Sequence, residues 1–259
     1  MIVSLFTEFH EHMFVIGLMY ARLLPMFFLL PVLNNSVISS TVTRNSIILA
    51  IIIGLWPAID TNIPVTSLSV VDMLFMAAKE AVVGTTIGFT LALPFWIFDA
   101  LGAYIDTARG ASMGSLIDPT SGQESTEASN FINFCVCVVY LESGGFQFIL
   151  GILVQSYHNV GMMQGFTIDF TESCFFLGKI LEQGFIIASP ILLILLLTES
   201  LLGLLSKFTP QLNAFSISLT IKSVIAFSIL SLYFWQMLPD KLSDLMNDYA
   251  GMQLLHGIN

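Results

Sequence analysis

The sequence predicts an all-α fold: a multi-helix, membrane-associated protein whose apolar helices are broken by proline. Hydrophobic residues make up 56% of the 259 residues, and the mean hydropathy is +0.86. Charged residues make up only 10%, against roughly 25% in average soluble domains, so they are too few to cover a water-exposed surface. The apolar residues also gather into long runs between polar breaks, which is typical of membrane-spanning helices.

Each apolar run is expected to form a helix. The runs occupy residues 13–33, 46–59, 68–78, 81–105, 131–154, 174–206 and 212–238. Several are shorter than the roughly 20 residues that cross a bilayer core, and others contain proline, which removes a helix hydrogen bond. No linker separates the runs, so we expect a single domain.

Charged residues lie within or beside these runs. A lone charge at the centre of a bilayer costs at least about 2.5–3.5 kcal/mol, so these charges must face protein, water or one another. They are Arg22, Lys79, Glu80, Asp99, Glu142, Lys179, Glu182, Glu199 and Lys222. We infer that much of the helical surface meets other subunits or a polar cavity.

Three of these charges have predicted structural roles. Arg22 precedes Pro25, and we expect it to hold carbonyl groups exposed at a helix break or to pair with an acid. Lys179 and Glu182 are three residues apart and can pair on one helix face. For that pair, a local ion pair that lowers the cost of burial is favoured over a proton relay.

The last two apolar runs are predicted to form an antiparallel helical hairpin. Its turn contains Lys207, Pro210, Gln211 and Asn213. Glu199 precedes Pro210 by 11 residues and Lys222 follows it by 12, so both lie level in the hairpin, roughly 17 Å from the turn. We therefore expect an ion pair across the hairpin or with a neighbouring subunit; the alternative is that each charge faces water separately.

A long polar segment, residues 106–130, separates two strongly apolar runs. Loops of this length in compact proteins are usually functional or disordered. The functional interpretation is a gate or plug in a pore, and the alternative is a solvated connection. Asp99 and Asp106 could line a cation path, but capping of a helix end is favoured. Ser121 and Glu124 fit a capping box for the next helix.

The sequence carries no signature of an enzyme, a metal site or a bound cofactor. It contains neither a nucleophile elbow nor an HExxH motif, and His10 and His12 are two apart, which suits no metal site on a helix face. The net charge is −10, and the 8 basic residues are scattered, which excludes a nucleic-acid partner. We therefore expect a non-enzymatic protein.

Several segments carry the patterns of a known family. RLLPMFFLLPVLN (22–34) is an arginine-led apolar run ending in proline, and KEAVVGTTIGFTLALPFW (79–96) contains regularly spaced small residues. RGASMGSLIDPTSG (109–122) ends in DP-x-S-G, and LLLTESLLGLLSKFTPQLNAFSISLTIKS (195–223) contains GLL-x-[KR]-x-x-PQ-x-[NS]-x-F. In this order, the segments resemble those of the FliR/SpaR/YscT/EscT family of the type III secretion export apparatus. The closing stretch, with its lysine at 222, resembles the SpaR/EscT virulence branch of that family more than the flagellar branch, which lacks this lysine.

The resemblance implies one export-apparatus domain over 1–259. It would comprise a FliP-like helical part at 1–173, a FliQ-like hairpin at 174–238 and a polar tail at 239–259. The loop would plug a closed pore, and the plug residues would be Arg109, Gly110, Met113, Gly114, Leu116, Ile117, Asp118, Pro119 and Gly122.

The resemblance also implies partners and a location. The chain would cross the bacterial inner membrane several times. Several copies of FliP/SpaP-like and FliQ/SpaQ-like subunits would join it there. An FlhB/SpaS-like switch protein and an FlhA/InvA-like export protein would adjoin it, and unfolded secreted proteins would pass through. The alternative function is a stand-alone proton-coupled or ion transporter that uses the intramembrane charges.

Overall fold

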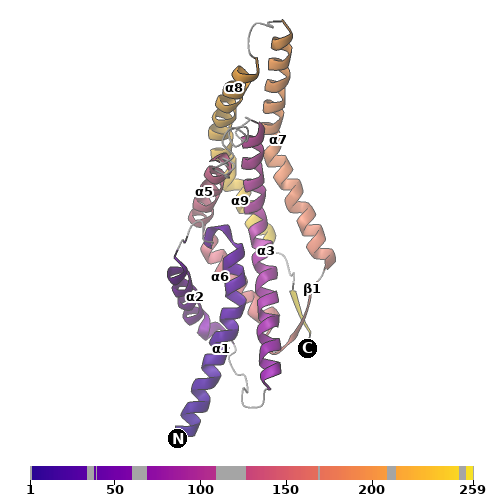
Figure 1. Ribbon diagram of the computed structural model, residues 1–259. Helices are drawn as coiled ribbons and strands as arrows, with labels where there is room; N and C mark the ends of the chain where they lie inside the picture. Colours follow the sequence, from indigo (N-terminus) through magenta and orange to yellow (C-terminus); the bar gives the residue numbers. More distant parts are fainter. Residues whose placement is uncertain are drawn as a thin grey trace. The chain divides into compact units, whose positions relative to one another are not determined.

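The computed structural model confirms the predicted all-α, membrane-type fold, with two short strands as the exception (Figure 1). It describes residues 2–33, 38, 40–59, 69–108, 127–168, 170–208, 214–250 and 255–258. In chain order the elements are α1 (Ile2–Leu29), η1 (Pro31–Leu33), α2 (Thr41–Leu55), η2 (Trp56–Ala58), α3 (Val70–Ala108), α5 (Glu127–Glu142), α6 (Gly145–Asn159), β1 (Gly165–Ile168), α7 (Phe170–Phe208), α8 (Ala214–Ile229), the π-helical η4 (Leu230–Phe234), α9 (Trp235–Ala250) and β2 (Leu255–Ile258).

The chain divides into two compact units, and each is assembled from separated segments. The first unit contains Met1–Leu93, Phe146–Cys174 and Ala250–Asn259, and the second contains Pro94–Gly145 and Phe175–Tyr249. Helix α3 continues from the first unit into the second at Pro94.

The core of the first unit forms around α1. Its buried side chains recur every three or four residues, as one face of an α-helix requires. They are Val15, Leu18, Met19, Arg22, Leu23, Met26 and Phe27. Helix α3 packs closely on this face through Gly84 and Gly88, since a Cβ at Gly84 would overlap the carbonyl oxygen of Arg22 and one at Gly88 would lie 2.7 Å from Met26 Cα. This small-xxx-small spacing lets two backbones approach closely.

Helix α3 corrects the sequence analysis, which expects two separate helices at 68–78 and 81–105. The structure has one helix, Val70–Ala108. Lys79 and Glu80 do not end it because both are good helix formers and because both charges are compensated inside the unit, as described below. Pro94 also lies within the helix, and Pro25, Pro190 and Pro239 lie within α1, α7 and α9, so at these four positions the predicted break by proline is wrong.

The predicted helix at 131–154 is instead a bent pair. Helix α5 ends at Glu142 and helix α6 begins at Gly145. The bend lies at Gly144, which has a φ of 83°, a backbone conformation that glycine adopts without strain. The paired glycines at 144 and 145 are the sequence signal for this bend.

The polar residues near the C-terminus also take up regular structure. Helix α9 continues through Pro239 and buries Leu238 and Leu242, while Lys241 Nζ lies 3.6 Å from Asp244 Oδ2. Strand β2 then pairs antiparallel with β1, so that Gly165 faces Ile258 in the register (Figure 1). The sequence analysis predicts neither strand, because each is only one four-residue segment.

Three described helices are long and apolar enough to cross a membrane. They are Phe9–Leu29, Val70–Ala108 and Leu177–Phe208. The number rises to 5 if each of two bent pairs, α5 with α6 and residues 218–232 with 236–244, counts as one span. Length and composition therefore agree with the membrane protein that the sequence predicts.

Candidate functional site

Arg22 of α1 is fully buried in the first unit and is held by four groups. Its Nε donates to Glu80 Oε2 at 2.6 Å, and its Nη1 donates to Ser156 Oγ at 3.0 Å. Its Nη2 donates to the carbonyl oxygen of Val160 at 3.1 Å, and its Cζ lies 3.9 Å from the ring centroid of Tyr157. Arg22 therefore pairs with an acid, as one of the two expectations has it, while the carbonyl group that it holds lies after α6 and not at a break in α1, which continues through Pro25.

Lys79 extends this arrangement from α3 into the turn that follows α6. Its Nζ lies 3.1 Å from Glu80 Oε1. It also donates to three carbonyl oxygens, those of Gly161 at 2.9 Å, Met162 at 2.6 Å and Gln164 at 3.1 Å. One ammonium group thus fixes the path of the backbone between α6 and β1.

We call Arg22, Lys79 and Glu80 the buried charge cluster. It contains two cations and one anion, and the side chains of Arg22 and Glu80 are fully buried. Backbone carbonyls at the C-terminal end of α6 compensate the second positive charge, since a helix carries partial negative charge at that end. Removing one partner from a buried ion pair typically costs about 3–5 kcal/mol. The cluster therefore ties α1, α3 and α6 together.

A second site lies in the second unit, at the two helix ends that flank the predicted plug loop. The Asp106 carboxylate accepts hydrogen bonds from the backbone N–H groups of Ala128 at 2.9 Å and Ser129 at 3.3 Å. The Ser129 hydroxyl donates to the Asp99 side chain, and a Cβ at Gly102 would overlap Ser129 Cα. Two backbone donors at the start of α5 that have no partner within the helix are thereby satisfied. This geometry is helix capping, which the sequence analysis favours for Asp106.

The predicted plug residues themselves lie outside the described residues. They are Arg109, Gly110, Met113, Gly114, Leu116, Ile117, Asp118, Pro119 and Gly122. Ser121 and Glu124, the predicted capping box, lie outside them too. The plug thus stays a prediction, while the two helix ends that border it are fixed by Asp106 and Ser129.

The structure brings Glu199 and Lys222 together in the second unit. Lys222 Nζ lies 3.1 Å from Glu199 Oε1, with side-chain exposures of 9% and 68% respectively. The ion pair spans α7 and α8, as the position of both residues relative to the turn suggests. A role for the pair in assembly stays a prediction.

The structure gives only the exposure, or no description, of the other predicted residues, which are those of the Lys179–Glu182 pair and of the hairpin turn. Lys179 is half-buried on α7 and Glu182 is exposed on the same helix, and their pairing stays a prediction. Lys207 is exposed in the last turn of α7. Pro210, Gln211 and Asn213 of the hairpin turn lie outside the described residues.

The side chains at both sites pair with one another and with backbone groups of neighbouring helices. Within the described part of the chain, no three His, Cys, Asp or Glu side chains lie where they could hold a metal ion. The buried charge cluster joins its charges to one another and to backbone carbonyls. The chemistry that these sites offer is therefore the joining of helices.

Comparison with known families decides what kind of protein carries these sites. The family model described as bacterial export proteins, family 1, matches residues 13–248. This chain belongs to that family. The match includes both the buried charge cluster and the Asp106 cap.

Individual export proteins resemble the chain over most of their length. "Surface presentation of antigens protein SpaR" of Salmonella typhimurium is 40% identical over 253 residues, which cover 97% of this chain and 95% of the relative. "Yop proteins translocation protein T" of Yersinia pestis is 30% identical over 227 residues, or 85% and 86% of the two chains. "Flagellar biosynthetic protein FliR" of Bacillus subtilis is 28% identical over 163 residues, or 61% and 62%.

Sequence reasoning about this export protein missed part of the buried charge cluster. It named Glu80 and Lys79 as charges that need partners but did not assign Glu80 to Arg22. The signal was present, since charges inside apolar helices must meet one another. The carbonyl groups that bind Lys79 left no signal, because every residue carries a carbonyl.

Proposed function

We propose that the chain is a non-enzymatic component of a type III secretion export gate in the bacterial inner membrane. It would form, with FliP/SpaP-like and FliQ/SpaQ-like subunits, the pore through which unfolded virulence proteins leave the cell. The observation that carries the proposal is the 40% identity to SpaR over nearly the whole of both chains. The FliP-like part at 1–173 and the FliQ-like hairpin at 174–238 belong to the same proposal.

The exposed surface of α7 supports the assembly part of the proposal. Large apolar side chains cover it, including Leu193 at 63%, Leu197 at 59% and Leu201 at 57% exposed. Only 22% of the 18-residue window that qualifies Leu177–Phe208 as a candidate span is buried within the chain. Such a face must meet lipid or neighbouring subunits, since large apolar patches mark protein or membrane contacts.

The plug part of the proposal concerns the segment 109–122. Its supports are its length, its position between two apolar helices, and the family resemblance. The Asp106 carboxylate and Ser129 join the two helices that border it, so the segment would leave and re-enter the second unit at one place. Such anchoring suits a loop that must return to one closed position.

Deletion of the plug segment tests this function directly. The complex is expressed with the segment 109–122 intact, deleted, or replaced by a Gly/Ser linker of equal length. Both altered chains are expected to make cells leaky to small solutes, because the closed pore would lack its plug. Unchanged permeability, at equal amounts of complex in the membrane, would remove the plug from the proposal.

Crosslinking separates a pore component from a scaffold that never meets the substrate. A photo-reactive residue is placed at Met113 or Leu116, and export is stalled with a substrate fused to a tightly folded domain. The proposal predicts crosslinks from both positions to the stalled substrate. A scaffold without pore contact would give none.

The stand-alone transporter is the weaker candidate. It needs intramembrane charges that can take up and release a proton or an ion. Arg22, Lys79 and Glu80 instead form ion pairs and hydrogen bonds with each other and with backbone carbonyls. This geometry favours a structural cluster.

A further inference from the structure

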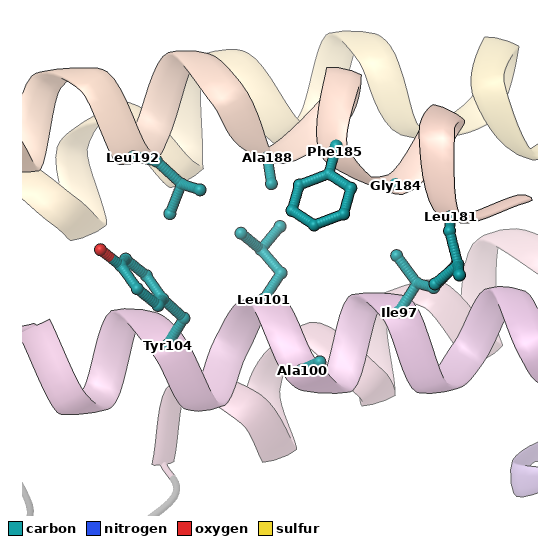
Figure 2. A pocket seen from close by; sticks show the side chains of 9 residues that line it. All are labelled: Ile97, Ala100, Leu101, Tyr104, Leu181, Gly184, Phe185, Ala188 and Leu192. Atoms are coloured by element: carbon teal, nitrogen blue, oxygen red, sulfur yellow. The ribbon is translucent and has the colours of Figure 1, made fainter. Parts of the chain in front are cut away.

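The two units leave different kinds of group at their surface. In the second unit, an apolar cavity of about 210 Å³ lies between α3 and α7, and Leu101 and Phe185 face each other across it (Figure 2). Phe185 is 69% exposed, so the cavity is part of the apolar surface of α7 that must meet lipid or neighbouring subunits. The first unit carries a backbone edge instead, that of strand β1, whose N–H and C=O groups need a partner strand.

Strand β2 covers one edge of β1. The antiparallel pairing runs from Gly165 opposite Ile258 to Ile168 opposite Leu255. Both strands belong to the first unit, although Phe175–Tyr249, which lies between them in the sequence, belongs to the second. Two four-residue strands are only marginally stable by themselves, and closing so long a loop costs further entropy. The pairing therefore needs a β1 that is already held in place.

Lys79 holds the turn from which β1 starts. Its Nζ donates to the carbonyl oxygens of Gly161, Met162 and Gln164. Within the turn, the backbone N–H of Gly161 donates to Gln164 Oε1 at 3.3 Å, and the backbone N–H of Gln164 donates to the carbonyl oxygen of Gly161 at 3.1 Å. The next residue, Gly165, is the first of β1. The ammonium group of Lys79 thus fixes the direction in which β1 leaves the turn.

The rest of the buried charge cluster does not need the charge of Lys79. Arg22 Nε and Glu80 Oε2 lie 2.6 Å apart, and the charges of this pair cancel. Lys79 Nζ lies 3.1 Å from Glu80 Oε1, but within the described residues that oxygen accepts no hydrogen bond. The three donors of an ammonium group serve the three carbonyl oxygens of the turn instead. Arg22 and Glu80 therefore join the helices, while Lys79 is placed for the turn.

We propose that β2 is a strap that closes on the edge of β1, and that Lys79 holds β1 in the position that receives it. While the strap is closed, this edge of β1 is unavailable to strands of other polypeptides. When Lys79 loses the turn, the strap opens, but Arg22 and Glu80 keep the helices joined. The strap does not depend on what the chain exports, so it can be refuted without refuting the proposed function.

Disulfide crosslinking in membranes tests whether the strap is closed. The full chain, expressed with its partner subunits, carries Thr167→Cys and His256→Cys, at two positions that are partners in the register. Partner Cα atoms in an antiparallel pair lie about 4.5–5.5 Å apart, which a disulfide can bridge. Ile168→Cys with Ile258→Cys is the control, because these positions lie at opposite ends of the ladder, about 10 Å apart along the strands.

Mass spectrometry of the oxidised membranes identifies the crosslinked peptides, so the three native cysteines need no replacement. We expect rapid crosslinking between positions 167 and 256 and little between positions 168 and 258. Equal crosslinking of the two pairs, or a crosslink that joins two copies of the chain, would overturn the proposal.

Lys79→Met supplies the decisive comparison. It should lower the rate of crosslinking between positions 167 and 256 at least about tenfold, because the turn loses three hydrogen bonds from a charged donor. Lys241→Met, which removes a lysine of α9 that is paired with Asp244, should leave the rate unchanged. Rates are compared at equal amounts of assembled complex, so that loss of the whole fold is not mistaken for an open strap.

Gln164→Ala replaces Lys79→Met if that chain does not accumulate. Gln164 is exposed, and its side chain accepts the hydrogen bond from the backbone N–H of Gly161. Loss of this bond should loosen the same turn and lower the crosslinking rate at least about threefold. A rate that stays the same when the turn is loosened would overturn the proposal.

Discussion

Single residues of the buried charge cluster hold much of the first unit together. Arg22 contacts α3 through Glu80 and α6 through Ser156, so one side chain joins three helices. Ser156 both accepts from Arg22 and donates to the carbonyl oxygen of Leu153 at 2.7 Å. Such a network is favourable only while every member has its partner.

Glu80→Gln should therefore destabilise the chain strongly. The change leaves Arg22 and Lys79 buried without their common counter-charge, and loss of one partner of a buried ion pair costs about 3–5 kcal/mol. Thermal unfolding of the complex purified with its partner subunits measures the effect. Glu182→Gln, at an exposed glutamate of α7, is the control and should change stability by less than about 0.5 kcal/mol. Equal stability of the two variants would contradict the structural role of the cluster.

The pair of Glu199 and Lys222 should behave asymmetrically. Lys222→Glu buries an anion beside Glu199 and should impair assembly clearly. Glu199→Lys changes a residue that is 68% exposed, and the effect should be smaller than that of Lys222→Glu because solvent screens the charge on the exposed partner. The yield of assembled complex measures the effect of each change. The double variant, Glu199→Lys with Lys222→Glu, should recover most of the yield that Lys222→Glu alone loses. Absence of recovery would show that the two charges do not act as a pair.

The elements differ in how much of them the sequence could predict. Long apolar runs predict the positions of α1, α3 and α7, since hydrophobic patterning dominates their formation. The joining of 68–78 and 81–105 into one helix could be read only in part from the sequence. Lys79 and Glu80 are good helix formers, but the carbonyl groups that compensate Lys79 belong to a distant turn. The pairing of β1 with β2 depends on segments almost a hundred residues apart, and each segment is only four residues long, too short for a strand to be predicted from it.

Because α3 packs closely on α1, alanine substitutions at two glycines should change the stability of the chain in opposite directions. Gly84→Ala should destabilise the chain by about 1–3 kcal/mol, because the added methyl group meets the backbone of Arg22. Gly17→Ala on α1 points into open space and should stabilise the helix by about 0.5–1 kcal/mol. Unfolding of both variants under the same conditions checks the pair. A harmless Gly84→Ala would show that α1 and α3 do not approach closely there.

Only part of each site could be predicted from the sequence. Arg22 and the Glu199–Lys222 pair stand out because a charge in an apolar run needs a partner. Asp106 was correctly favoured as a cap, but its partners Ala128 and Ser129 depend on how α3 and α5 pack.

For the whole molecule, the central claim is that neighbouring subunits cover the apolar faces that this chain leaves exposed. Mean hydropathy, the exposed leucines of α7 and membership of the export-protein family agree with that claim. A chain with this surface should be poorly stable alone and gain stability when partners bind, because a partner that binds only the folded state shifts the folding equilibrium.

Co-purification from a membrane extract tests the claim most directly. The tagged chain is expressed with and without the FliP/SpaP-like and FliQ/SpaQ-like subunits of the same cell, and both preparations are solubilised in the same mild detergent. We expect the chain to bring both partners down in a defined complex and to be degraded or aggregated without them. A stable, monodisperse chain that carries neither partner would contradict the account.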